Sequence, residues 1–159
     1  MSARERILAT ASELFYREGI RAIGVYTVVE RSGVSKTSLY RLFDSKDALI
    51  AAFAAEQDRL FWTWWDRIEE RHAADPRALL DALLGGIAKR IVRPDYLGCP
   101  FLNLATEFPD INHPGRVIGS GGATRSNCGT GSGRSWPKLA PAIPTGPRLK
   151  SRTSSTAHT

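Results

Sequence analysis

Apolar side chains recur at helical spacing through the first 110 residues of the chain. Between residues 3 and 18 they fall at steps of one, three and four, as Ile7, Leu8, Ala11, Leu14 and Phe15. This spacing predicts an amphipathic helix, and Gly19 predicts where that helix ends.

The same period predicts three later helices, over residues 46–72, 77–92 and 101–108. Asp44 or Ser45 is placed to cap the first of them. Its expected inward stripe is Leu49, Phe53, Leu60, Trp64 and Ile68. In the helix over 77–92, the expected buried side is Leu79, Leu80, Leu83, Leu84, Ile87 and Ile91. We therefore expect an all-α fold.

A turn between two short segments refines this picture. The β-branched residues of 25–32 leave the type of that segment open by propensity alone. After it, Gly33 can take a positive φ in a tight turn, and Ser35 is placed to cap a helix over 36–43. Leu39 and Phe43 lie four residues apart and are expected to face inward. The prediction is a helix, a turn and a second helix.

The outer face of the second helix has the side chains that a DNA-reading helix needs. Such a helix uses cationic groups for phosphates and small hydrogen-bonding groups for base edges in the major groove. The expected phosphate contacts are Lys36, Tyr40, Arg41 and Lys46, and the expected base contacts are Thr37 and Ser38. The alternative is an ordinary solvated helix face with an N-cap.

The run GVYTVVERSGVSKTSLYRLFDSKDALIAAF resembles the DNA-binding half of TetR-type transcriptional regulators. The family pattern is A-G-V-S-[K/A]-x-[T/S]-L-Y-x-[H/Y]-F followed by x-[S/N]-K-[E/D]-x-L. The matching positions are Gly33, Val34, Ser35, Lys36, Ser38, Leu39, Tyr40, Phe43, Ser45, Lys46, Asp47 and Leu49. Further on, GCPFLNLATEFPD with His113-Pro114 resembles the ligand-domain segment of one TetR subgroup, so the resemblance covers about residues 3–118.

The resemblance implies a helix-turn-helix DNA-binding domain over 1–45 and a partial helical ligand-binding and dimerisation domain over 46–118. It implies a ligand-responsive repressor that binds a palindromic operator in double-stranded DNA as a homodimer, with a small effector that changes the separation of the two recognition helices. It also suggests Tyr26 and Thr27 as phosphate contacts. Tyr26 departs from the family, which commonly has a small polar or acidic residue there, and Val29 stands where alanine is usual.

An aromatic run lies on the expected helix over 46–72. In the resembled family this helix lines the effector pocket, so a flat hydrophobic or aromatic inducer is one interpretation. The candidate pocket residues are Phe61, Trp64, Trp65 and Phe101. The alternative is core packing, because aromatic residues at helical spacing are usually core.

The net charge of +6 belongs to the end of the chain. Residues 1–112 carry 15 Lys and Arg against 16 Asp and Glu, while residues 113–159 carry seven basic residues and no acidic one. Charge alone would therefore point to the wrong segment for DNA binding. It leaves open an alternative function, a basic-tailed scaffold that binds acidic partners or nucleic acid without sequence preference.

Residues 119–159 consist mainly of Gly, Ser, Thr, Arg, Pro and Ala, with no helical or alternating apolar period. The composition predicts a disordered basic tail. The abrupt change in composition also indicates out-of-frame sequence, because a back-translation read in another frame recovers an apolar stripe at helical spacing. On that interpretation the last two helices of the resembled family are missing, and we expect an impaired repressor that is poorly stable, prone to aggregation or monomeric.

Other function classes find no support. The chain has no nucleophile with a base, no paired carboxylates and no phosphate loop, since the glycines at 119–122 follow no strand. We therefore expect no enzyme and no cofactor. We expect no disulfide and no metal from Cys99, Cys128, His72, His113 and His158, whose spacing fits neither. No apolar run suits a signal peptide or a membrane span, so we expect a cytoplasmic protein.

Overall fold

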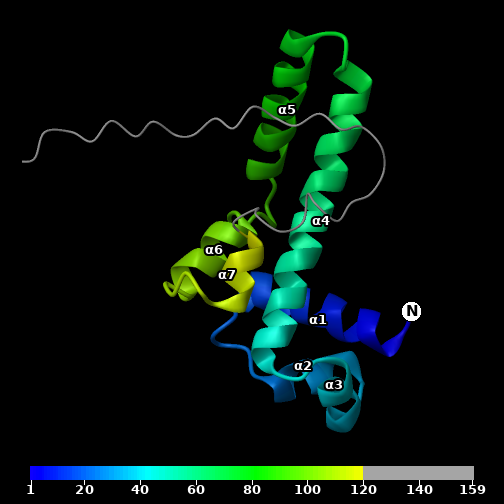
Figure 1. Cartoon of the computed structure of the whole chain (residues 1–159), viewed down its shortest axis with the longest axis vertical. Helices are drawn as coiled ribbons and strands as arrows, with labels where there is room; N and C mark the ends of the chain where they lie inside the picture. Colours follow the sequence, from blue (N-terminus) through cyan, green and yellow to red (C-terminus); the bar gives the residue numbers. More distant parts are fainter. Residues whose placement is uncertain (120–159) are drawn as a thin grey trace, which may run out of the picture. The chain divides into compact units, whose positions relative to one another are not determined.

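The computed structural model describes residues 1–119, and the expectations for the tail lie outside these residues. The described chain is all-α (Figure 1). Its helices are α1 (Ala3–Glu18), α2 (Val25–Ser32), α3 (Lys36–Leu42), α4 (Lys46–His72), α5 (Pro76–Ile91), α6 (Pro100–Glu107) and α7 (Pro114–Gly119). None of these helices is long and apolar enough to cross a membrane.

Side-chain caps fix where most of these helices begin. Ser2 and Glu5 form a reciprocal capping box at the start of α1. Ser35 caps α3, and Ser45, rather than Asp44, caps α4 through the backbone N–H of Ala48. Asp75 caps α5. Each cap satisfies backbone donors that the first turn leaves without a partner, so the local sequence sets these boundaries.

One hydrophobic core joins α1, α2, α3, the first half of α4 and α6. The expected stripe of α1 lies in this core, with Ile7 and Ala11 fully buried. Phe15 of α1 meets Phe53 of α4 edge to face, with ring centroids 5.7 Å apart. Leu104 of α6 is also buried in this cluster. The start of α4 is therefore held by the same apolar contacts as the helix-turn-helix.

The prediction of which residues of α5 are buried is largely wrong. Leu83 is buried, whereas the large apolar residues that are exposed on this helix are Leu80, Leu84, Ile87 and Ile91. Leu60, expected in the α4 stripe, is also exposed. Within residues 1–119, α5 packs against α4 (Figure 1). One neighbouring helix covers only part of an apolar stripe this wide.

Two short helices pack beside α4. The hydroxyl of Tyr16, on α1, donates to the carbonyl of Gly98 in the loop before α6. Glu107, at the end of α6, accepts a hydrogen bond from the backbone N–H of Ile20, which follows α1. α7 packs mainly against α4, and a Cβ at Gly115 would lie 2.8 Å from a methyl carbon of Ile50. The sequence pattern did not predict α7, because its six residues are too few to show a period. The expected domain boundary at residues 45–46 coincides with the cap of α4 and stays a prediction.

Candidate nucleic-acid interface

The turn between α2 and α3 is set by a glycine and an arginine. Gly33 ends α2 in the left-handed conformation, with φ of 62°, and its N–H donates to the carbonyl of Val29. A guanidinium nitrogen of Arg6, on α1, donates to the carbonyl oxygens of Ser32 and Gly33, at 2.8 Å each. These bonds tie the turn to α1 and so fix how α3 is presented.

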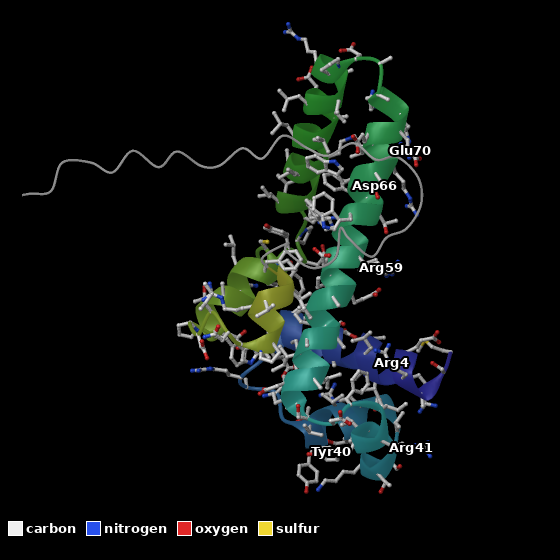
Figure 2. The ribbon with its side chains drawn as sticks, in the orientation of Figure 1. Arg4, Tyr40, Arg41, Arg59, Asp66 and Glu70 are labelled. Carbon is white, nitrogen blue, oxygen red and sulfur yellow. The ribbon has the colours of Figure 1, made fainter. Side chains whose placement is uncertain are left out.

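The inward and outward faces of α3 differ as the sequence predicts. Leu39 is fully buried and Phe43, the residue that follows α3, is 4% exposed. Thr37, Tyr40 and Arg41 are exposed on the other side. Figure 2 shows Tyr40 and Arg41 on α3, at the opposite end of α4 from α5. The face combines a hydroxyl, a phenol and a guanidinium over an apolar anchor.

Three other side chains predicted to contact DNA are partly buried or hydrogen-bonded within the chain. The hydroxyl oxygen of Ser38 accepts a hydrogen bond from the Ser35 hydroxyl at 3.0 Å, and its backbone N–H donates to the same Ser35 oxygen. Thr27 on α2 is half-buried. Lys46 is half-buried at the start of α4, where burial lowers the pKa of its ammonium and the Glu107 carboxylate offsets part of that effect.

Tyr26 and Lys36 are in direct contact, although they come from different helices. The Nζ atom of Lys36 donates to the phenol oxygen of Tyr26 at 2.6 Å. The same nitrogen lies 4.4 Å from the ring centroid of Tyr26 and 5.9 Å from that of Tyr40. The hydrogen bond to Lys36, and then its charge, lower the pKa of Tyr26. The structure therefore brings three of the predicted residues together in one cationic and aromatic cluster.

Two arginines of α1 adjoin this surface and were not identified from the sequence. Arg6 supports the turn. Arg4, labelled on α1 in Figure 2, is exposed, and its guanidinium lies 5.2 Å from the centroid of the Phe43 ring. Arg6 is 26 residues from Ser32, so no local period connects the two. The sequence feature that could have identified these arginines is the presence of two basic residues in the first turns of the helix that precedes the helix-turn-helix.

A second candidate site is a groove of about 780 Å³ between α1, α4, α5 and α6. Phe61, Trp64 and Phe101 are among its lining residues, whereas Trp65 is not. Trp65 instead packs against Phe61, with ring centroids 6.0 Å apart. Three of the four predicted pocket residues thus face one groove, which is wide enough for a small molecule.

Within residues 1–119, no three His, Cys, Asp or Glu side chains come together in a way that could hold a metal ion. Cys99 is half-buried at the start of α6 and has a free thiol. Cys128 and His158 lie outside the described residues.

Comparison with known proteins gives a family match in the N-terminal part. The model of the family described as bacterial regulatory proteins, tetR family, matches residues 7–53. An uncharacterized HTH-type transcriptional regulator of Mycobacterium tuberculosis is 37% identical over 57 residues, which are 36% of this chain and 28% of that protein. The uncharacterized HTH-type transcriptional regulator YxaF of Bacillus subtilis is 29% identical over 124 residues, 73% of this chain and 61% of that protein.

Solved structures extend the similarity past the helix-turn-helix. SCO4454, a TetR-family transcriptional regulator from Streptomyces coelicolor, is 32% identical with a TM-score of 0.69 over 75% of this chain and 62% of that chain. A putative TetR transcriptional regulator from Streptomyces avermitilis is 33% identical with a TM-score of 0.64, over 76% and 65%. This chain thus spans less than two thirds of the length of each of these relatives.

Proposed function

We propose that the chain is a transcriptional regulator of the tetR family, whose model matches residues 7–53, and that it binds double-stranded DNA through α3. The proposed contacts are Tyr26, Thr27, Lys36, Thr37, Ser38, Tyr40, Arg41 and Lys46. No chemical step is part of this function.

One observation carries the proposal, the exposed polar face of α3 on a buried anchor. Leu39 and Phe43 fix the helix against the core, while Thr37, Tyr40 and Arg41 point away from it. A helix in the major groove needs this division, because the anchor sets its angle and the outer side chains reach base edges and phosphates. The cap from Ser35 starts the helix next to those side chains.

A duplex titration tests the proposal. A duplex selected by the chain from a random-sequence library is compared with a scrambled duplex over a range of salt concentrations. If α3 contacts the base edges, the affinity for the selected duplex should exceed that for the scrambled duplex at least about 1,000-fold at physiological salt. Equal affinity for both duplexes, with both lost as salt rises, would instead support the scaffold with a basic tail.

We further propose repression by two copies on a palindromic operator. The resemblance to TetR-type regulators implies a homodimer on an operator, and a dimer matches the two-fold symmetry of a palindrome. In the described residues, apolar side chains of α5 are exposed to solvent, and an exposed apolar surface of this kind favours self-association. Sedimentation with and without the selected duplex tests the stoichiometry, and a single copy on each selected duplex would contradict it.

The groove beside Trp64 is the proposed effector site. Its aromatic side chains suit a flat apolar molecule, and Phe61, Trp64 and Phe101 contribute to its wall. The dye anilinonaphthalene sulfonate is a suitable probe. Trp64→Leu should weaken dye binding several-fold, whereas Trp65→Leu serves as the matched control outside the lining. Equal dye affinity in the two variants would remove the site.

A further inference from the structure

The contact between Tyr26 and Lys36 crosses the turn of the helix-turn-helix. Tyr26 is the second residue of α2, and Lys36 is the first residue of α3. Their hydrogen bond of 2.6 Å lies on the exposed side of the turn, where Tyr26 is 70% exposed. Arg6 holds the same turn through Ser32 and Gly33. The two helices are therefore linked at the surface by one side-chain pair.

We propose that Tyr26 is a positioning residue that holds the Lys36 ammonium for a DNA backbone phosphate and donates its own hydroxyl proton to that phosphate. The inference rests on the proposed function, because it takes DNA as the partner. It adds that the two residues act as one unit rather than as separate contacts.

The donor and acceptor roles of the pair allow this arrangement. The Lys36 ammonium has three N–H donors and uses one of them on the phenol oxygen of Tyr26. The phenol accepts that bond, so its own proton is left to donate. Two donors separated by 2.6 Å can reach the two non-bridging oxygens of one phosphate. The remaining N–H groups of Lys36 can supply the charge-assisted bond.

The rings also restrict the lysine. A free lysine side chain has many rotamers, and the entropy lost when it binds a phosphate weakens the contact. Here the ammonium lies 4.4 Å from the Tyr26 ring centroid and 5.9 Å from that of Tyr40. These contacts hold it on the same surface as Tyr40, so less freedom remains to be lost on binding.

The protonation equilibria favour the same roles. Lys36 lowers the pKa of the Tyr26 phenol, which makes the hydroxyl a stronger hydrogen-bond donor to an anion. The same hydrogen bond raises the pKa of the Lys36 ammonium, which therefore stays charged. Both residues are exposed at the surface, so their contact is available to a partner.

The test is a double-mutant cycle with Tyr26→Phe and Lys36→Gln, measured on the duplex selected by the wild-type chain. Tyr26→Phe removes the hydroxyl, so it should weaken binding about tenfold. Because it keeps the ring and the net charge, the salt dependence of the affinity should not change. Lys36→Gln should reduce the slope of log affinity against log salt by about 0.9. In the Lys36→Gln background, Tyr26→Phe should cost less than about twofold.

Lys89→Gln is the matched charge control, because Lys89 is an exposed lysine of α5. It should leave both the affinity and the salt slope as in the wild type. Two results would overturn the pairing while the proposed function stands. One is a Tyr26→Phe affinity equal to that of the wild type, and the other is an equal loss from Tyr26→Phe with Lys36 and with Gln at position 36. A wild-type chain with no duplex preference would overturn both.

Discussion

The carboxylate of Glu107 lies 2.7 Å from the backbone nitrogen of Arg21 and accepts its hydrogen bond. The other carboxylate oxygen accepts from the backbone N–H of Ile20 at 3.0 Å. Glu107 is the last residue of α6, whereas Ile20 and Arg21 follow α1. The side chain therefore fastens α6 to the chain that leads into the helix-turn-helix.

Removal of this carboxylate should loosen that connection. Glu107→Ala leaves two backbone donors without their partner, and one of them is partly buried, so we expect a loss of about 1–3 kcal/mol in the free energy of unfolding. Urea unfolding followed by circular dichroism measures it. Glu70→Ala, on the exposed side of α4 (Figure 2), is the control and should stay within about 0.5 kcal/mol of the wild type. Equal midpoints for the two variants would mean that the Glu107 bonds do not stabilise the fold.

Gly33 is a second point at which one substitution should matter. Its φ of 62° disfavours a β-branched side chain, and a Cβ there would lie 3.3 Å from a guanidinium nitrogen of Arg6. Gly33→Val should therefore lower the free energy of unfolding by more than about 1 kcal/mol. Gly33→Asn should cost less, because asparagine tolerates the left-handed region. Thermal melting compares the two, and a Val variant as stable as the Asn variant would contradict the turn geometry.

Two adjacent glycines of α5 should respond in opposite directions. A Cβ at Gly86 would lie 2.6 Å from a ring carbon of Trp64, so Gly86→Ala forces the indole to move and should destabilise the chain by about 1–3 kcal/mol. A Cβ at Gly85 meets nothing within 4 Å, and Gly85→Ala should stabilise the helix by about 0.5–1 kcal/mol. Melting curves and tryptophan fluorescence report both effects. Destabilisation by both variants would mean that α5 packs on α4 in a different register.

The phenol of Tyr26 should titrate at lower pH than an ordinary tyrosine. Its pKa is lowered by Lys36, so ionisation should begin below the usual value near 10. Ultraviolet absorbance during an alkaline titration should show this early component in the wild type and lose it in Tyr26→Phe. DNA affinity should fall over the same pH range, because the phenolate repels phosphate and no longer donates a proton. A wild-type titration without this early component would show that the contact with Lys36 is absent in solution.

The local parts of this structure could be predicted from the sequence, because their causes lie within a few residues. Gly33, Ser35 and the stripe of α1 each mark a turn, a cap or a buried face through short spacing. The same holds for the outward face of α3. All of the predicted helices were found, with bounds that differ by one residue at most.

The long-range contacts could not be predicted in this way. Glu107 meets Arg21 across 86 residues, and the hydroxyl of Tyr16 meets the backbone of Leu97 across 81. No periodic pattern links such positions, because the contact depends on how whole helices pack. The prediction of the buried residues of α5 failed for the same reason. Apolar spacing indicates which face of a helix is apolar, but not whether another element covers that face.

If α3 is the recognition helix, Thr37 contacts a base edge, and its replacement should change which base is preferred. The wild type and Thr37→Ala are titrated against the selected duplex and against every single-base variant of it, with circular dichroism to confirm equal helical content. We expect Thr37→Ala to lose about 1–3 kcal/mol on the selected duplex and its preference to relax at one base position and at the symmetry mate of that position. Unchanged affinity and unchanged preference at every position would contradict the assignment of α3 as the recognition helix.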